Sequence, residues 1–323
     1  MKALVLGPDG PRITDAPRPA PGPDDVLVRV RACGLNRADL GMAAGAKHGA
    51  AGGAGAVLGM EFAGEVAETG ANVAGLRAGD RVMCSGAGGF AEYAVANAAR
   101  AVPIPTAAMS FEQAATLPVA LPTMHDAVVT HGQLATGGTV LIQGASSGVG
   151  LVAMQIARLR GAALVIGSST DAARRARLAE FGAHLAVDSS DPAWVDEVLK
   201  ATGGRGVDLI VDQVSGSVAN QNLRATRVLG RIVNVGRLGG MHGDFDFDLH
   251  ALRRITYVGV TFRTRSVDEV REIVERMRAD LGDDVAAGRI RLPIDRVFAL
   301  DDALDALAHM RANRHFGKVV LRA

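Results

Sequence analysis

Residues 144–150, with the sequence GASSGVG, carry small side chains between an apolar run and a helical pattern. The preceding run TVLIQ is rich in β-branched residues, as in a parallel strand that is buried on both faces. After the stretch, Val152 and Ile156 fall on one helical stripe. In a strand–turn–helix, glycines let the backbone approach a pyrophosphate, which binds N–H groups at the helix N-terminus. The predicted phosphate-binding residues are Gly144, Ser146, Ser147, Gly148, Val149 and Gly150.

The spacing departs from G-x-G-x-x-G, so a loop without a ligand is the alternative interpretation.

The choice of cofactor depends on the end of the next strand pattern, VIGSST. An NAD site usually has Asp or Glu about 20 residues past the glycines, to bind the ribose hydroxyls. Here Gly167, Ser168 and Ser169 stand there instead, and Arg174 and Arg175 follow. Their charge would attract a 2′-phosphate, which favours NADP (NADPH), unless both arginines only solvate a helix face. Adjacent helical residues point about 100° apart, so we expect one of them, Arg174, to face the phosphate.

The elements that would position this loop alternate between strand and helix. Such alternation predicts a doubly wound parallel sheet of the Rossmann type, with helices on both faces. Ligands bind at the carboxyl ends of these strands, so Val235 and Gly236 join the expected cofactor site. The strand patterns cover residues 139–143, 163–167, 184–187, 207–214 and 231–236, and one intervening helix is expected over about 171–181.

Length and composition bound the remaining possibilities. The 323 residues suit two domains, and 48% hydrophobic with 21% charged residues suits two ordinary cores. A formal net charge of +1 does not indicate a basic surface that would bind nucleic acid or an acidic membrane. We find no leader pattern and no apolar stretch of about 18 residues, and only Cys33 and Cys84 are cysteines. We therefore expect a cytoplasmic protein.

The chain outside the Rossmann-type region is rich in short strand patterns. Half of the 12 prolines lie in the first 25 residues, which predicts turns and an extended edge. The Ala- and Gly-rich segment 42–57 is either a lid or a loose loop. The closing strand GKVVLR needs a neighbouring strand to pair with, and the simplest expectation is that it pairs with the N-terminal β-rich domain. We therefore predict a discontinuous domain, 1–121 with 264–323, around a nucleotide-binding domain at 122–263.

Ten stretches, in order along the chain, resemble the zinc-free quinone oxidoreductase, or zeta-crystallin-like, branch of the medium-chain dehydrogenase/reductase superfamily. The resemblance implies a GroES-like catalytic domain, a Rossmann domain, and NADPH-dependent reduction of quinones or activated alkenes. The stretches are GLNRAD, GMEFAGEV, AGDRV, GGFAEYAVA, AATLPVALPTMHDAV, VLIQGASSGVG, EFGA, GRIVNVG, TFRTRS and FGKVVL.

The resemblance also implies that metal ligands have been lost. Zinc-dependent relatives carry a ligand cysteine where this chain has Asn36 and a ligand histidine where it has Met60. Neither replacement is a usual zinc ligand. Two cysteines cannot form the four-cysteine cluster of the structural zinc. We therefore expect no metal site.

Further site residues are implied by the matched stretches. Lys47 stands where relatives have a tyrosine beside the nicotinamide, and Ser189 where they have one near the adenine. His125 replaces an aromatic residue, so the cleft is expected to be more open. The cofactor-binding residues that the resemblance adds are Lys47, Thr123, Ser189, Phe262 and Arg263.

Three residues are candidates for catalysis. Asn36 could donate to a carbonyl oxygen or fix the nicotinamide ribose, or it could bond its own loop. His125 has an ordinary pKa near neutrality and is a possible proton donor, the alternative being a packed histidine. Arg263 could reach the cofactor or pair with a carboxylate. Asp39 could orient Asn36, although capping a helix is the favoured role.

Three functions remain open. The first is an NADPH-dependent quinone or enone reductase, which acts on a small molecule. The second is an enoyl-thioester (acyl-CoA or acyl carrier protein) reductase, because GLNRAD also resembles a stretch of enoyl reductase modules. The third is a non-catalytic NADPH-binding protein. We further expect a homodimer, formed through the sheet edge around residues 257–262, since an unpaired apolar edge promotes association.

Overall fold

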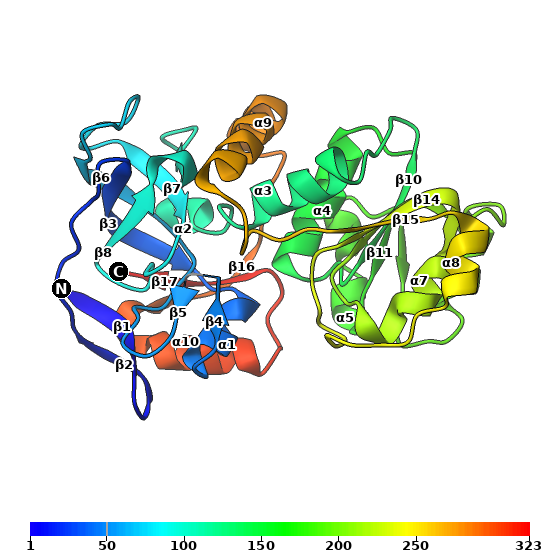
Figure 1. Ribbon diagram of the computed structural model, residues 1–323, viewed down its shortest axis with the longest axis horizontal. Helices are drawn as coiled ribbons and strands as arrows, with labels where there is room; N and C mark the ends of the chain where they lie inside the picture. The colour runs from blue at the N-terminus through cyan, green and yellow to red at the C-terminus, as the bar shows by residue number, and fades with distance from the viewer. Residues whose placement is uncertain (50) are drawn as a thin grey trace. The chain divides into compact units, whose positions relative to one another are not determined.

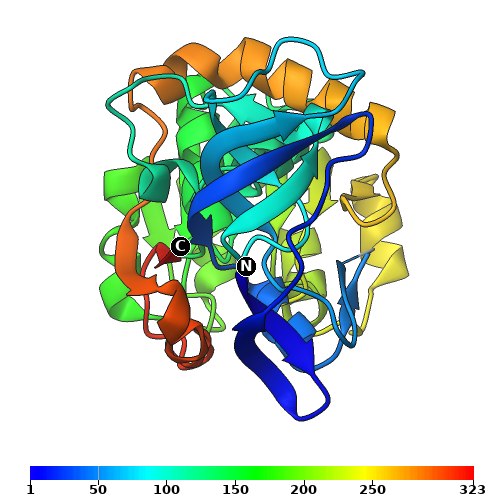
Figure 2. The ribbon, with the colours of Figure 1, turned by 90° about the vertical axis from the view of Figure 1, so that its left-hand side faces the viewer.

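The computed structural model describes residues 1–49 and 51–323. The chain divides into two compact units. Unit 1 contains Met1–Pro122 and Phe262–Ala323, and unit 2 contains Thr123–Thr261. These boundaries lie within two residues of those expected from the sequence. Unit 1 is thus built from both ends of the chain, and the two termini lie near one another in Figures 1 and 2.

Unit 2 contains a six-stranded parallel sheet in the order β12-β11-β10-β13-β14-β15. Counted along the chain this is 3-2-1-4-5-6, the strand order of the Rossmann fold. The order reverses between β10 and β13, where the carboxyl ends of the strands leave a crevice for a ligand. The strands are β10 (Thr139–Gln143), β11 (Leu164–Ser168), β12 (Leu185–Val187), β13 (Val207–Asp212), β14 (Thr226–Asn234) and β15 (Thr256–Gly259).

Helices cover this sheet because its strands carry apolar side chains on both faces. Leu141, Ile166 and Ile210 form one buried cluster with side chains of α6 and α7. Their strand neighbours point the other way, toward the face where α4 contacts β10 and β11. Figure 1 shows these helices around the sheet. The helical segments are α3 (Ala120–His125), the π-helical turn η2 (Asp126–Thr130), α4 (Gly148–Leu159), α5 (Ala172–Arg175), η3 (Leu178–Phe181), α6 (Trp194–Ala201), η4 (Gly216–Val218), α7 (Ala219–Ala225) and α8 (Phe247–Arg253).

The expected helix over 171–181 is wrong as a single element. It consists of the short helix α5 and the 3₁₀ turn η3, separated by Ala176 and Arg177. Asp171 caps α5 by accepting a hydrogen bond from Arg174 N at 2.9 Å. Gly182, in the left-handed conformation, ends η3.

Unit 1 contains a seven-stranded sheet in the order β16-β17-β3-β6-β7-β9, with β8 also paired to β3. The last strand, β17, pairs antiparallel with β3, which confirms that the chain returns to the N-terminal strands. The strands of this sheet are β3 (Asp25–Gly34), β6 (Glu61–Thr69), β7 (Arg81–Ser85), β8 (Tyr93–Asn97), β9 (Ala101–Pro103), β16 (Ile294–Ala299) and β17 (Lys318–Arg322), and β1 (Lys2–Gly7) pairs with β2 (Gly10–Asp15) beside it.

The Ala- and Gly-rich segment 42–57 contains a short hairpin, β4 (Lys47–His48) with β5 (Ala51–Gly52). Ala50 lies outside the described residues. The hairpin contacts helix α1 (Arg37–Ala43): a Cβ added at Gly52 would lie 3.1 Å from Met42 Cγ. The described part of the segment is therefore packed against unit 1.

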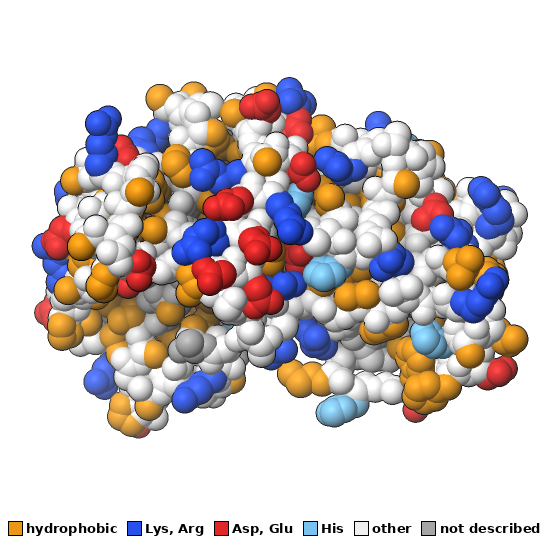
Figure 3. Space-filling view, turned by 45° about the horizontal axis from the view of Figure 1, so that its top comes forward, with side chains coloured by type: hydrophobic (Ala, Val, Ile, Leu, Met, Phe, Trp, Pro, Cys, Tyr) orange, Lys and Arg blue, Asp and Glu red, His pale blue; other side chains and the backbone are white. Residues whose placement is uncertain are grey.

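Helix α9 (Val267–Ala286) begins with a capping box. Ser266 Oγ accepts from Glu269 N at 3.2 Å, and the Glu269 carboxylate accepts from Ser266 N at 2.7 Å. Figure 2 shows this long helix along the upper side of unit 1. Acidic and basic side chains are interspersed on the face drawn in Figure 3, in keeping with the net charge of +1. The remaining helical segments are η1 (Ala98–Arg100), α2 (Phe111–Ala114), η5 (Leu300–Asp302) and α10 (Ala303–Arg311).

Candidate functional site

Residues 144–150, which the sequence predicts to bind a phosphate and which are here called the phosphate-binding loop, lie between β10 and α4. Ser147 caps α4, and its Oγ accepts a hydrogen bond from Gly150 N at 3.1 Å. Gly148 and Val149 are the first two residues of the helix, so their N–H groups have no acceptor within it. Gly144 has φ +68°, in the left-handed region that glycine tolerates. The loop therefore presents helix N-terminal N–H donors that fit a pyrophosphate.

Close packing explains why two further glycines are required. A Cβ on Gly150 would lie 2.7 Å from Ala145 Cα, where α4 passes the loop. A Cβ on Gly236 would lie 2.6 Å from Gln213 O, and Gly236 N donates to Asp212 O at 3.2 Å. The ends of β13 and β14 are thus held together at the carboxyl edge of the sheet, where Val235 and Gly236 were expected.

Ser168 is the last residue of β11 and Ser169 follows it, but their hydroxyls differ in role. Ser168 is fully buried; it donates to Gln143 Oε1 at 2.6 Å and accepts from Gly144 N at 3.0 Å. This corrects the expectation that Ser168 contacts a 2′-phosphate directly, because its hydroxyl supports the loop from within the fold. Ser169 Oγ lies 3.0 Å from Ser146 Oγ and connects the strand end to the loop.

The two arginines after β11 are placed differently. Arg175 donates to Ser169 O at 2.7 Å and pairs with the Asp188 carboxylate at 3.0 Å. Arg175 therefore fastens the end of β11 to the segment after β12, next to Ser189. Arg174 has its Nε 4.0 Å from Asp171 Oδ2, and its side chain is 15% exposed. Arg174 stays the predicted ligand of a 2′-phosphate, and Arg175, which contacts Ser169 and Asp188, stays the alternative.

Thr123 and His125 lie on α3, directly before the π-helical turn η2. Such turns within helices are frequent at functional sites. The His125 side chain is 1% exposed, which is the burial of a packed histidine rather than of a proton donor open to substrate. Thr123 is half-buried.

Asn36 belongs to a buried polar cluster in unit 1. Lys318 Nζ donates to Leu35 O at 2.7 Å and to Asn36 Oδ1 at 3.1 Å, and it forms an ion pair with Glu61 Oε1. Asn36 Nδ2 in turn donates to Glu61 Oε1 at 2.9 Å. Glu61 Oε2 accepts from Val119 N at 2.8 Å. These contacts fix the orientation of the Asn36 amide and leave one hydrogen on Nδ2 for another acceptor.

Asp39 caps α1 and is completely buried beside this cluster. Its Oδ2 accepts from Asn36 N at 2.6 Å, whereas no described residue donates to its Oδ1. Burial raises the pKa of Asp39 to about 7, a shift that the Asn36 N–H and the Lys318 charge oppose and the Glu61 charge reinforces. The favoured capping role is confirmed.

Lys47, Phe262 and Arg263 also lie in unit 1. The hairpin that carries Lys47 passes close to Arg263: a Cβ added at Gly49 would lie 3.3 Å from Arg263 O. Burial, followed by the charge of Arg263, lowers the pKa of the neighbouring His48. The guanidinium of Arg265 lies over the Phe262 ring, 5.9 Å from its centroid. His48 was not expected in this region.

Asn36, one of the two positions where zinc-dependent relatives carry a ligand, lies beside the Lys318 ammonium. The oxygens of Asn36 and Glu61 face the Lys318 ammonium, which already occupies the place of a cation. Cys33 and Cys84 are buried, and burial raises the pKa of both thiols, which disfavours the thiolate that binds zinc. Within 1–49 and 51–323, no group of three or more His, Cys, Asp or Glu side chains could hold a metal.

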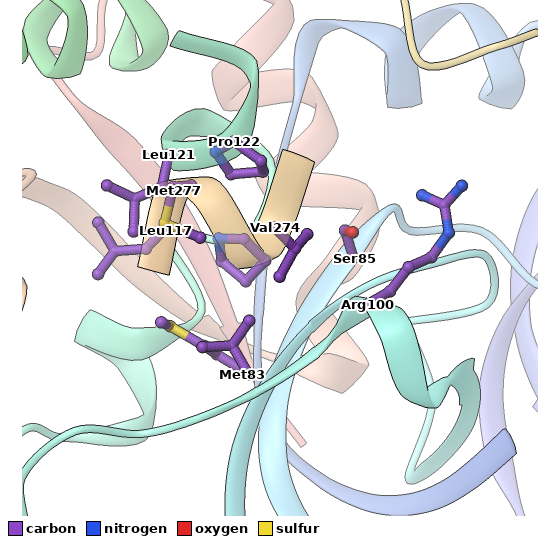
Figure 4. A pocket seen from close by; sticks show the side chains of 10 residues that line it. Met83, Ser85, Arg100, Leu117, Leu121, Pro122, Val274 and Met277 are labelled. Atoms are coloured by element: carbon purple, nitrogen blue, oxygen red, sulfur yellow. The ribbon is translucent and has the colours of Figure 1, made fainter. Parts of the chain in front are cut away.

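A small cavity in unit 1, shown in Figure 4, lies where α9 packs against residues 117–122. Its volume is about 10 Å³, and Leu117, Leu121 and Met277 are among its lining residues. Such a volume accommodates one water molecule at most. The cavity is therefore a packing detail of unit 1 and no substrate site.

Several buried polar residues of the two units could not be predicted from local patterns. Gln143, Asp212, Gln213, Asn222, Glu61 and Lys318 were not singled out. Glu61 and Lys318 stand in the matched stretches GMEFAGEV and FGKVVL, but neither pattern indicates that they meet.

A Rossmann sheet with a phosphate-binding loop, found in unit 2, defines a dinucleotide-binding protein.

Comparisons with known proteins identify the family to which this dinucleotide-binding protein is similar. A family model described as zinc-binding dehydrogenase matches residues 148–279, and one described as alcohol dehydrogenase GroES-like domain matches residues 22–106. The chain is 31% identical over 342 residues to the synaptic vesicle membrane protein VAT-1 homolog of Rattus norvegicus, covering 99% of this chain and 84% of that protein. It is 31% identical over 313 residues to one component of the phenolphthiocerol/phthiocerol polyketide synthase of Mycobacterium tuberculosis, covering 97% of this chain but only 14% of that protein.

Solved structures agree with these relatives. An alcohol dehydrogenase superfamily protein from Novosphingobium aromaticivorans is 30% identical, with a TM-score of 0.88 over 100% of this chain and 99% of that one. A mycobacterial quinone oxidoreductase is 26% identical, with a TM-score of 0.88 over the whole of both chains. A mycobacterial protein in complex with NADPH is 25% identical, with a TM-score of 0.87 over the whole of both chains.

The chain belongs to the medium-chain dehydrogenase/reductase superfamily, and its likeness to solved quinone oxidoreductases is consistent with the expected branch. This is a superfamily of oxidoreductases that bind a nicotinamide cofactor. Among the described residues, no helix is long and apolar enough to span a membrane.

Proposed function

We propose that this protein transfers a hydride from NADPH to a quinone or to an α,β-unsaturated carbonyl compound, without zinc. The observation that carries the proposal is the phosphate-binding loop at the N-terminus of α4, next to a β11 end that has serines and Arg174 instead of a carboxylate. A 2′-phosphate would meet the Arg174 cation there, and Asp171, the acid that contacts Arg174, also caps α5. The similar mycobacterial structure in complex with NADPH supports this choice.

The residues that hold the cofactor fall into two groups. In unit 2, the N–H groups of Gly148 and Val149 bind the pyrophosphate, and Arg174 with Ser169 binds the 2′-phosphate. The further cofactor-binding residues proposed for unit 2 are Thr123, Ser146, Gly167, Ser189, Val235 and Gly236. Lys47, Phe262 and Arg263, which belong to unit 1, stay predictions from the sequence.

When bound, NADPH supplies the hydride from C4 of its nicotinamide ring. The protein has to stabilise the negative charge that develops on the substrate oxygen. Asn36 is suited to this task because Lys318 and Glu61 hold its amide and leave one Nδ2 hydrogen to donate. Arg263 is the second candidate. Since His125 is buried, we propose that the proton comes from water or another exposed group.

An enoyl-thioester substrate is the second candidate. The observation that favours it is the match of 97% of this chain to a segment of a polyketide synthase. Both candidates share the hydride step and differ in the group that activates the alkene. A non-catalytic NADPH-binding role stays open until turnover is measured. The two free, buried cysteines fit a location in the cytoplasm.

A substrate panel tests the proposal. Purified protein is incubated with NADPH or NADH and with quinones, free enones, or the CoA thioesters of matching enoic acids, while loss of reduced cofactor is followed. We expect turnover with NADPH on a quinone or free enone, unchanged after treatment with a strong chelator. Turnover confined to thioesters would select the second candidate, and cofactor binding without turnover would select the non-catalytic role. Stoichiometric zinc with chelator-sensitive activity would contradict metal independence.

A further inference from the structure

Four buried polar side chains form a continuous chain beneath the phosphate-binding loop of unit 2. They are Asp212, Asn222, Gln143 and Ser168, here called the Asp212 relay. Asp212, Gln143 and Ser168 are the last residues of β13, β10 and β11, and Asn222 lies on α7. Each is at most 1% exposed. The relay therefore connects three strand ends to one helix inside the fold.

Every link of the relay is a hydrogen bond of ordinary length. Asn222 Nδ2 donates to Asp212 Oδ2 at 3.0 Å, and Gln143 Nε2 donates to Asn222 Oδ1 at 2.8 Å. Ser168 Oγ donates to Gln143 Oε1 at 2.6 Å. Gly144 N, the first N–H of the phosphate-binding loop, donates to Ser168 Oγ at 3.0 Å. Three side chains thus connect the Asp212 carboxylate to the first N–H group of the loop by hydrogen bonds.

The direction of these bonds is set at the two ends of the relay. The other oxygen of Asp212 accepts from Val214 N at 2.8 Å and from Ser215 N at 2.9 Å, so the carboxylate only accepts. At the opposite end, the N–H of Gly144 can only donate. Both amides between them can therefore satisfy their neighbours in one orientation alone.

A second set of contacts fixes the far side of the loop. Gln213 Nε2 donates to Gln143 O at 3.1 Å, and Gln213 Oε1 accepts from Ser147 Oγ at 2.8 Å. Ser147 is the residue that caps α4. Gln143 therefore serves both sets, through its side chain to Ser168 and through its carbonyl to Gln213.

We propose that Asp212 is a positioning residue for cofactor binding. Its carboxylate sets the direction of the relay, which turns Gly144 N inward and holds residues 144–150 in the shape that receives a pyrophosphate. The inference rests on the proposed function, because it requires that this loop binds a dinucleotide. Since NADPH and NADH share the pyrophosphate, the relay serves both cofactors equally.

The substitution Asp212→Asn tests this role with little change in shape. If its oxygen keeps the Val214 and Ser215 N–H groups, its new NH₂ group faces Asn222 Nδ2, and two donors oppose each other. Buried polar groups left unsatisfied in this way weaken an equilibrium by roughly 10-fold or more. We expect the Kd values for NADPH and for NADH to rise by that common factor. The readout is the fluorescence of bound reduced nicotinamide, well below the Tm of each variant.

The exchange variant Asp212→Asn with Asn222→Asp provides the rescue. In it, the amide at 212 donates to the carboxylate at 222, and that carboxylate accepts from Gln143 Nε2. Every bond toward Gly144 regains its direction. We therefore expect the Kd to return toward the wild-type value, which a mere loss of packing or charge would not predict.

The matched control is Asp208→Asn, at the amino end of the same strand β13. Asp208 accepts from Thr139 N and Thr139 Oγ, both at 2.7 Å, and pairs with Arg227. Its removal should lower the Tm while the Kd of both cofactors stays unchanged. If Asp212→Asn does not fold, Ser168→Ala takes its place, because it deletes the last link before Gly144 N and should raise both Kd values.

The outcomes separate the relay from the proposed function. Wild-type protein that binds neither cofactor would overturn the proposed function and the relay with it. Wild-type protein that binds NADPH, with Asp212→Asn binding equally well, would overturn the relay alone. An exchange variant that folds but binds as weakly as Asp212→Asn would also overturn it, as would equal weakening by Asp208→Asn.

Discussion

Lys318 and Glu61 form an ion pair inside unit 1, with side chains that are 7% and 0% exposed. All three hydrogens of the ammonium group have oxygen acceptors, on Leu35, Asn36 and Glu61. A buried charge is tolerated only when it is paired and hydrogen-bonded in this way. The pair therefore holds Asn36 in place and depends on both of its members.

Replacing the lysine should destabilise the protein strongly. Lys318→Met leaves the Glu61 carboxylate buried without its cation, and breaking such a pair costs about 3–5 kcal/mol of unfolding free energy. Urea denaturation measures this loss. Adding Glu61→Gln should recover part of it, because the uncompensated charge disappears. The control is Arg276→Met, which removes an exposed partner of Glu272 at 3.5 Å and should cost at most about 1 kcal/mol. Equal effects of Lys318→Met and Arg276→Met would contradict this account.

Asp39 should make stability depend on pH in a defined direction. Burial raises its pKa to about 7 in the folded protein, whereas an unfolded Asp titrates near 3.9. Between these values the folded state holds more protons than the unfolded state, so the Asp39 contribution to stability falls as pH rises from about 4 to 7. Above pH 7 the ionised, buried carboxylate destabilises the fold.

The variant Asp39→Asn isolates this contribution. Its amide cannot ionise, so its stability relative to wild type should improve by about 1–3 kcal/mol between pH 5 and pH 8. Denaturation of both proteins at several pH values measures the difference. A difference that stays constant over this range, or that moves the other way, would show that Asp39 is ionised throughout.

Arg174 should discriminate between the cofactors. Arg174→Ala removes a charge-assisted contact to a group present only in NADPH, worth about 1.5–3 kcal/mol. We expect kcat/KM with NADPH to fall roughly 10- to 150-fold and kcat/KM with NADH to change little.

Arg175→Ala is the comparison for Arg174→Ala. Arg175 fastens Ser169 and Asp188 together, so its loss should affect both cofactors alike. A wild type that prefers NADH, or an equal loss with both cofactors in Arg174→Ala, would refute the assignment of the 2′-phosphate pocket.

The protein should form a homodimer through the edge of the unit 2 sheet. Strand β15 pairs with β14 and ends the sheet, and exposed apolar side chains lie beside it on α8, with Phe247 76% and Leu252 69% exposed. The Phe245 ring lies 5.0 Å from Phe247 and 5.9 Å from Tyr257, centroid to centroid. Covering such an edge and patch favours self-association.

Light scattering at micromolar concentration should give the mass of a dimer. The double variant Phe247→Asp with Leu252→Asp should be a monomer, because two carboxylates would be buried at the interface. Leu304→Asp, at an exposed site on α10, should remain a dimer. A monomeric wild type would refute the dimer, and a double variant that stays dimeric would move the interface elsewhere.

Local patterns predicted most of the fold, because the strands of unit 2 are short apolar runs bounded by glycines and helices. The turn at Gly144 was predicted for the same reason. The helix over 171–181 was wrong, since periodicity alone does not locate the break after Arg175. Helical patterns give the face that is buried, but not each boundary.

The residues of the candidate site could be predicted only where they are neighbours in the sequence. Residues 144–150 follow one strand directly, and their chemistry is contained in one turn. The pair of Glu61 and Lys318 is separated by 257 residues, and the Asp212 relay joins three strands with a helix. Neither periodicity nor spacing indicates which polar residues meet across such distances. The same limit explains why Ser168 was expected at a phosphate and is found buried beneath the loop.

Hydride transfer itself can be followed with NADPH that carries deuterium at C4. A free enone that wild-type protein reduces is incubated with each C4-deuterated form of the cofactor, and the product is analysed by mass spectrometry. The proposed function predicts one NADPH oxidised per product and deuterium at the β-carbon from one of the two forms only. Product without deuterium from either form, or no oxidation of NADPH with any quinone, enone or enoyl thioester, would contradict it.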